Sequence, residues 1–118
     1  MPIVTVKYKK GVLSTSQIAE MTPKVQQALA IGLDCLEHPM KPEDSDIEFI
    51  ERHPTYEGDI DVLIEVLAQD YPSRVYNLVE RVNRMDSELQ PIFPKSMKCC
   101  FGTTLTRHHG TSFEGSAS

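Results

Sequence analysis

Residues 60–68 read IDVLIEVLA, and this stretch decides which fold we expect. Every second residue from position 60 to position 68 is apolar, which is the two-residue period of a β-strand. Leu63 and Leu67 place apolar side chains on the alternate face too, so both faces should be at least partly covered. Asp70-Tyr71-Pro72 then marks the start of a helix. The apolar stripe of that helix has helical spacing: Val75, Leu78, Val79, Val82, Met85 and Leu89.

Three further strands surround this strand and helix. Alternating residues predict strands at positions 2–9, 46–53 and 97–106. Between the first two, Ser14 and Gln17 have the three-residue spacing of a capping box, which predicts the start of a helix. Apolar residues recur at helical spacing as far as Leu36, and the internal Pro23 predicts a kink in one continuous helix.

The order strand, helix, strand, strand, helix, strand makes two consecutive βαβ units. Strands joined by a helical crossover run parallel. We therefore expect an α+β fold, βαββαβ, with a four-stranded mixed sheet and two helices on one face. We expect one domain over residues 1–118, in which residues 107–118 form a polar tail.

Two helices cover only one face of such a sheet, so the opposite face needs a partner. If residues such as Val4, Val6, Leu63 and Leu67 were exposed there, they would form a large apolar patch. Other copies of the same chain are the simplest way to cover this face of the sheet. We therefore expect a small closed homo-oligomer whose sheets face inward.

Charge and composition narrow the classes of partner. The 118 residues carry 12 Lys+Arg against 17 Asp+Glu, a formal net charge of −5, which argues against nucleic-acid binding. No apolar run approaches the roughly 18 residues of a membrane span, and the start lacks the features of a signal peptide. We therefore expect no membrane partner and a cytoplasmic location.

The cysteines and histidines predict neither a disulfide framework nor a metal site. Cys35, Cys99 and Cys100 include no CxxC pair, and we expect all three to be buried small hydrophobes. The spacing of three histidines lacks the local pairs that a zinc site requires: His53, His108 and His109. With no Gly-rich phosphate loop either, we expect no cofactor.

Pro2 is the candidate catalytic residue. If Met1 is removed, as a small second residue permits, the chain begins with a secondary amine at the end of a strand. The pKa of an α-amino group is about 7.7–8.0 in a short peptide; burial lowers it and a neighbouring carboxylate raises it. Such an amine can act as a general base or acid near neutral pH. If Met1 is retained, the Pro2 nitrogen is an amide and can do neither.

The Met-Pro start, the strand that follows it and the element order resemble those of the tautomerase superfamily. Its members include 4-oxalocrotonate tautomerase, macrophage migration inhibitory factor and malonate semialdehyde decarboxylase. The resemblance covers residues 2–107 at the level of element order, and the layout is most similar to that of uncharacterised tautomerase-like domains. It implies that Pro2 is the catalytic acid or base and that the chains assemble into trimers or hexamers; we expect a homotrimer.

The resemblance also implies which residues surround the proline. In the decarboxylase branch, an Asp before the second strand and two Arg after the third complete the site. Asp44 or Asp46 can fill the first role here. The two arginine positions are held by Gln69 and Tyr71, with Arg74 one helical step later. This departure argues against decarboxylase and dehalogenase chemistry, because a carboxylate is bound best by a bidentate guanidinium.

The same resemblance points to two more arginines, because pockets in the superfamily often lie between subunits. Arg52 ends the second strand, away from its own subunit's Pro2, and Arg107 follows the fourth strand; either can serve a neighbouring subunit. Simpler readings stay open. Arg74 near a helix start is typical of a solvated surface residue, and Asp70 is typical of a helix cap.

We therefore expect a tautomerase-like enzyme, an isomerase in which Pro2 moves a proton on a small carbonyl or enol acid. Its substrate would be a small carboxylate or carbonyl compound. The alternative is a non-catalytic trimeric ligand-binding or interaction protein of the same fold, in which Pro2 only starts a strand. A ferredoxin-like regulatory or RNA-binding domain shares the element order, but an acidic chain with 4 Tyr, 4 Phe and no Trp disfavours RNA.

Overall fold

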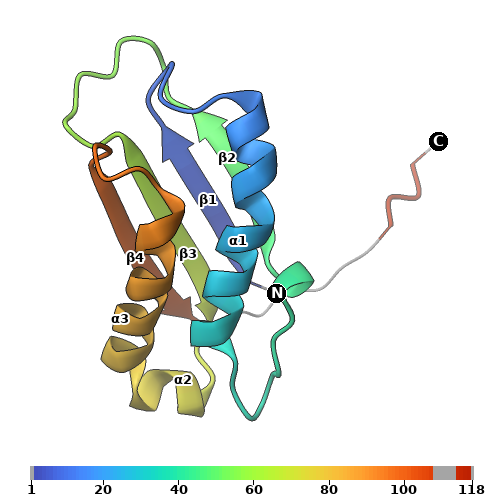
Figure 1. Cartoon of the computed structure of the whole chain (residues 1–118). Helices are drawn as coiled ribbons and strands as arrows, with labels where there is room; N and C mark the ends of the chain where they lie inside the picture. The colour runs from blue at the N-terminus through green and yellow to red at the C-terminus, as the bar shows by residue number, and fades with distance from the viewer. Residues whose placement is uncertain (1, 108–113, 118) are drawn as a thin grey trace.

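Four strands form one mixed sheet, as the sequence predicts. The computed structural model describes residues 2–107 and 114–117. The strands are β1 (Ile3–Tyr8), β2 (Asp46–Glu51), β3 (Val62–Gln69) and β4 (Cys99–Thr106). Their order across the sheet is β2-β1-β3-β4, with β1 parallel to β2, β1 antiparallel to β3, and β3 parallel to β4 (Figure 1). The beginnings of β1 and β2 and the ends of β3 and β4 therefore meet at one end of the sheet.

The first helix, α1 (Thr15–Leu33), forms where the capping box predicts it. The Ser14 hydroxyl accepts a hydrogen bond from the Gln17 amide, and the Gln17 side chain accepts one from the Ser14 amide. The helix continues through Pro23, so the prediction of one helix is confirmed. It ends at Leu33, before the Leu36 that the periodicity includes, because the chain leaves helical dihedrals at Asp34.

The second predicted helix is two helices, α2 (Pro72–Tyr76) and α3 (Leu78–Leu89). Asn77 separates them with φ −128° and ψ 39°, and its side-chain oxygen accepts a hydrogen bond of 2.6 Å from Arg81 Nε. The break at Asn77 is a departure of its backbone from helical dihedrals, which the apolar periodicity does not reveal. Short 3₁₀ turns occupy Pro42–Asp44 (η1) and Gln90–Ile92 (η2).

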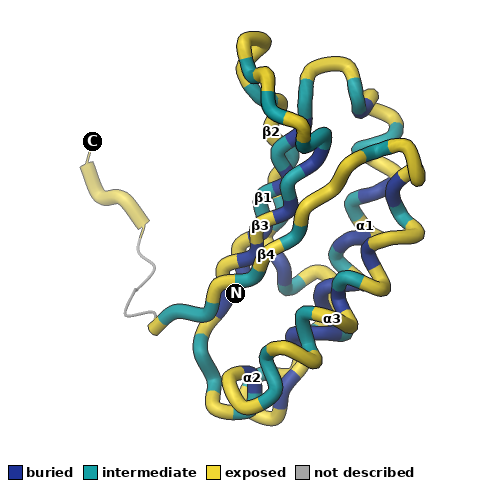
Figure 2. The backbone as a smooth tube through the Cα atoms, turned by 90° about the vertical axis from the view of Figure 1, so that its left-hand side faces the viewer, coloured by how far each residue is buried: buried dark blue, intermediate teal, exposed yellow. Residues whose placement is uncertain are grey.

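The helices cover one face of the sheet and leave the other open, as Figure 2 shows from the side. Val4 and Val6 lie under the helices, 1% and 0% exposed, so the expectation that they share the open face is wrong. The open face belongs to the odd-numbered residues of β1, because side chains alternate along a strand. Ile3 and Leu67 are register partners there, 49% and 42% exposed. The open face is apolar at this end, and the Lys7–Glu65 ion pair of 3.3 Å lies nearer its middle.

Gly32 allows α1 and α3 to approach closely. A Cβ at this position would collide with Cγ of Met85. Met85 is fully buried in the core between the helices and the sheet. The contact brings the carboxyl end of α1 against α3, near the end of the sheet where β1 begins (Figure 1).

The cysteine prediction holds for one residue of three. Cys35 is buried after α1, whereas Cys99 and Cys100 are exposed, and all three are free thiols. Cys99 and Cys100 begin β4, which is an edge strand and has a partner on one side only. Their exposure follows from this edge position, which strand periodicity alone does not predict.

Candidate functional site

Pro2 lies in a buried position between two neighbouring strands. It is under 2% exposed, and its carbonyl oxygen accepts a hydrogen bond of 2.9 Å from the Asp46 amide. Continuing the two registers by one residue places Ser45 on one side of Pro2 and Ala68 on the other. Both neighbours are 3% exposed. Polar chemistry at this end must therefore occur in a largely dry environment.

Arg74 is buried at the same end, and the reading of it as a solvated surface residue is wrong. It is 1% exposed. Its Nε donates to the Leu33 carbonyl at the end of α1 (2.9 Å), and its Nη1 donates to the Gln69 carbonyl at the end of β3 (3.1 Å). The guanidinium carbon lies 5.0 Å from the centre of the Tyr71 ring. Two backbone carbonyls and one aromatic ring thus hold the guanidinium.

The Arg74 charge has no opposite charge beside it in the described part of the chain. No carboxylate among residues 2–107 and 114–117 forms an ion pair with it, and its Nη2 is buried without a hydrogen-bond partner. Burying an unpaired charge is costly, and an orphaned donor adds to that cost. An anionic ligand at Nη2 would remove both penalties.

The connection from α1 to β2 packs against Arg74 through Tyr71. We call its residues 34–41 the strap. The His38 ring stacks on the Tyr71 ring, with centroids 5.9 Å apart and planes 16° apart. Both Glu37 carboxylate oxygens accept hydrogen bonds from Ser73, one from its hydroxyl and one from its amide (3.1 Å). These bonds, the hydroxyl one first, hold the pKa of Glu37 below its usual value, and the charge of Arg74 adds a smaller effect in the same direction.

Buried polar atoms without partners concentrate at this end. Among the described residues there are five, and three belong to the strap, the start of β2 and α2: His38 Nε2, Ser45 Oγ and Arg74 Nη2. Most buried polar groups in proteins are hydrogen-bonded, so such a group calls for an explanation.

The structure brings most of the predicted site residues to the Pro2 end. Asp46 bonds the Pro2 carbonyl through its amide, and Gln69 contributes its carbonyl to Arg74. Arg107 follows β4 at this end and pairs with Asp70, Nε to Oδ2 at 3.8 Å. Asp70 therefore does not cap α2; Tyr71 occupies the N-cap position, without a side-chain cap.

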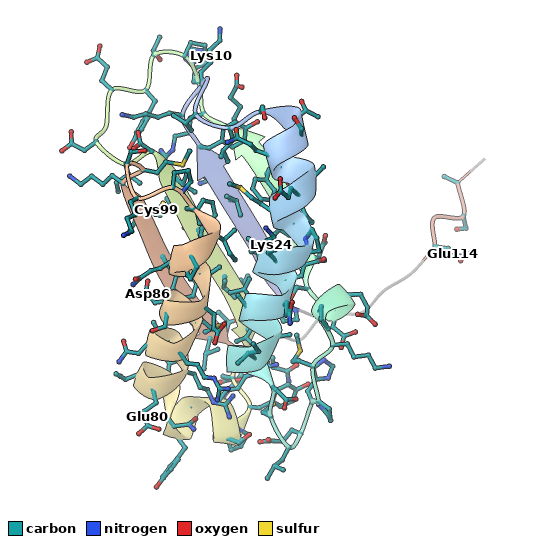
Figure 3. All side chains as sticks on the ribbon, viewed as in Figure 1. Lys10, Lys24, Glu80, Asp86, Cys99 and Glu114 are labelled. Carbon is teal, nitrogen blue, oxygen red and sulfur yellow. The ribbon has the colours of Figure 1, made fainter. Side chains whose placement is uncertain are left out.

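Arg52 lies at the opposite end of the sheet, as expected for its own subunit. Its guanidinium carbon is 4.1 Å from the centre of the Tyr56 ring, a close cation–π contact. Figure 3 labels Lys10 and Cys99 at this end. A hollow of about 460 Å³ opens nearby between α3 and β4, lined mostly by apolar side chains such as Phe93, Met97 and Phe101. Burial, first, and the charge of Asp61, second, raise the pKa of Cys99, which borders it.

Sequence reasoning missed His38, Glu37 and Ser45 as neighbours of the site. His38-Pro39 is a helix-stopping pair, and the sequence reads as a connector there. One signal in the sequence points to this region. Ser45 lies between Asp44 and Asp46, and the resemblance implies a site Asp before the second strand. The stacking of His38 on Tyr71 joins residues 33 positions apart, and no local pattern encodes that.

The described residues support neither a metal site nor a membrane-spanning helix. Residues 2–107 and 114–117 contain no group of three side chains placed to hold a metal ion. Two of the three histidines named above, His108 and His109, lie outside the described residues. Over the same residues, no helix is both long enough and apolar enough to cross a membrane.

Comparisons with known proteins identify the fold. No family model matches the chain, and no curated protein matches it by sequence. Among solved structures, a malonate semialdehyde decarboxylase inhibited by 3-bromopropiolate superimposes with a TM-score of 0.68 at 16% identity, covering 98% of this chain and 91% of that one. The chain has the tautomerase-superfamily fold.

Other structures of this fold agree. A macrophage migration inhibitory factor-like protein from Entamoeba histolytica gives a TM-score of 0.63 at 8% identity, covering 98% of this chain and 96% of that one. A domain of unknown function from Sebaldella termitidis gives 0.53 at 17% identity, with 90% and 89% covered. At such identities the likeness establishes the tautomerase fold alone.

Proposed function

We propose that the chain is a tautomerase-like enzyme in which the amino group of Pro2 moves a proton on a small carbonyl or enol acid. Arg74 would bind the acid group of the substrate. One observation carries the proposal: a 1% exposed guanidinium, without a carboxylate partner in the described part of the chain, keeps an unpartnered Nη2 at the strand end that adjoins Pro2. A carboxylate ligand supplies the missing charge and acceptor.

The proton transfer needs no co-substrate. In ketonisation the enol hydroxyl loses a proton and the adjacent carbon gains one, so atoms and charge balance within the substrate. A free Pro2 amine would lie at the same end of the sheet as Arg74. It can accept a proton as a general base and return it as a general acid.

Removal of Met1 is the required first step, since a Met1–Pro2 peptide bond leaves no basic nitrogen. The intact mass of the native protein tests this directly. Ketonisation of a simple enol acid should then be catalysed by processed wild type and lost with Pro2→Ala. A variant that carries an extra amino-terminal residue is the matched control, because it keeps the Pro2 ring and removes only the amine. Equal rates in all three proteins would remove Pro2 from the mechanism.

A homotrimer closed by the open sheet face is part of the proposal. Ile3, Ile50 and Leu67 are large apolar residues exposed by 39% to 49%, and sheet-to-sheet contact would bury those of the open face. The assembly could bring a neighbour's Arg52 or Arg107 to the pocket. Light scattering on wild type should give three times the chain mass, and Leu67→Lys should lower it. We propose the cytosol as its location, since the free cysteines suit a reducing compartment.

The second candidate function is a carboxylate-binding protein without catalysis. The contacts of Arg74 favour it, because they involve no Pro2 nitrogen and persist when Met1 is retained. It predicts that the native protein keeps Met1 and binds a small carboxylate through Arg74, with no ketonisation. Intact mass and a binding titration with pyruvate separate the two functions.

A further inference from the structure

Glu37 is an acid that approaches Arg74 without pairing with it. The charge of Arg74 contributes a small part to the lowered pKa of Glu37, yet both Glu37 carboxylate oxygens accept hydrogen bonds from Ser73, the residue that precedes Arg74 in the chain. Ser73 thus binds the carboxylate that lies beside Arg74, and Arg74 has no ion pair among the described residues. The contact lies at the surface, where Ser73 also lines a groove of about 640 Å³ between the strap and α2.

A carboxylate generally binds a guanidinium more strongly than it binds neutral donors. Bonds between two charged groups are shorter and about twice as strong as neutral ones. Ser73→Ala removes the hydroxyl donor and leaves Glu37 only backbone amides as neutral partners, so Nη2 of Arg74 would compete for the carboxylate on better terms. The His38–Tyr71 stack keeps the strap against α2, so a released Glu37 would remain close to Arg74.

We propose that Glu37 is an internal competitor for the anion site and that Ser73 is the latch that holds it off Arg74. Ser73 is then a positioning residue, because it keeps Arg74 available without touching the ligand. This inference rests on the proposed function, because that function supplies the anion that binds at Arg74. It adds that the chain itself carries a rival carboxylate, so that anion affinity depends on the contact between the strap and α2.

The test is a double-mutant cycle with pyruvate as the probe. Ser73→Ala should weaken pyruvate binding about tenfold, because the ligand must now displace a charge-assisted pair. Adding Glu37→Gln to that variant should restore wild-type affinity or better. Glu37→Gln alone should bind at least as well as wild type. Glu43→Gln, on the same connection, makes the same charge change and should have no effect.

Rescue is the outcome that a merely structural role would not produce. If Ser73 and Glu37 only anchored the strap, the double variant would bind no better than Ser73→Ala, and the proposal would be overturned. Unchanged binding in Ser73→Ala would overturn it as well. In kinetics, Ser73→Ala should raise KM and leave kcat near wild type, whereas Pro2→Ala lowers kcat.

A ligand-free readout separates this inference from the proposed function. The side-chain NH resonances of Arg74 should shift in Ser73→Ala, as a new ion pair forms, and return in the Ser73→Ala/Glu37→Gln variant. If wild type binds no pyruvate, the anion-site proposal fails, and these resonances still decide whether Ser73 holds Glu37 off Arg74. An Arg74 spectrum that is the same in all variants would overturn the latch alone.

Discussion

The two ends of the sheet each hold an arginine against a tyrosine, but in opposite states. At the Pro2 end, Arg74 is 1% exposed, lies 5.0 Å from the Tyr71 ring and donates to two carbonyls. At the other end, Arg52 lies 4.1 Å from the Tyr56 ring and is half-buried. Each guanidinium has one buried nitrogen without a hydrogen-bond partner among the described residues, Nε in Arg52 and Nη2 in Arg74. The difference teaches that neither the aromatic contact nor an orphaned donor distinguishes the two arginines; the depth of burial does.

Arginine substitutions at the two ends should have the largest and most different effects on pyruvate affinity. Arg74→Met should weaken pyruvate binding roughly 10- to 100-fold, the value of losing hydrogen bonds to a charged group. Arg52→Met should change it less than about twofold, because that guanidinium lies at the far end. Calorimetric titration of folded protein measures both. Equal losses would mean that a neighbour's Arg52 completes the pocket, which would confirm a site shared between subunits.

The close helix contact beside Arg74 should be the next most sensitive feature. Gly32→Ala forces a Cβ against Met85 and should lower the free energy of unfolding by about 1–3 kcal/mol. Gly102→Ala in β4, where a Cβ meets nothing within 4 Å, should change it by no more than about 0.5 kcal/mol. Urea unfolding checks both. An unchanged free energy of unfolding in Gly32→Ala would show that Met85 moves aside freely.

Acid should loosen the strap at the Pro2 end. The pKa of Glu37 is lowered in the folded chain, so its contact with Ser73 adds stability above the unfolded pKa and loses it as pH falls through the folded one. The Ser73 amide NMR signal should therefore titrate with a midpoint below that of glutamate in a short peptide. In Glu37→Gln that transition should vanish. A midpoint at the ordinary glutamate value would contradict the contact.

The smallest effect concerns the far end. The raised pKa of Cys99 reduces its thiolate fraction, so iodoacetamide should alkylate it a few-fold more slowly than a cysteine in a short peptide at pH 8. A Cys100→Ser variant isolates the Cys99 signal in mass spectrometry. Faster alkylation than the peptide would contradict a thiol that is kept protonated, and would make the hollow beside it a reactive site.

Much of the fold follows from local patterns. The alternation at β3, the capping box of α1 and the element order predict strands, helices and their parallel or antiparallel pairing. The errors arise where a long-range contact decides. Val4 and Val6 have apolar patterning that suits either face, and the helices determine which one they cover. By contrast, the break between α2 and α3 is local, at the non-helical backbone of Asn77, and apolar periodicity does not reveal it.

The candidate site divides in the same way. The sequence by itself determined a proline at the start of a strand, the two-residue period of that strand and the presence of Arg74 just after β3, because each depends on neighbours in the chain. Only the tertiary structure decided that Arg74 is buried, faces Tyr71 and has no ion pair among the described residues, and that Ser73 donates hydrogen bonds to Glu37. These features arise because Leu33, Gln69 and the strap come together around Arg74 and its neighbours only in the folded chain. Burial and charge pairing depend on such long-range contacts.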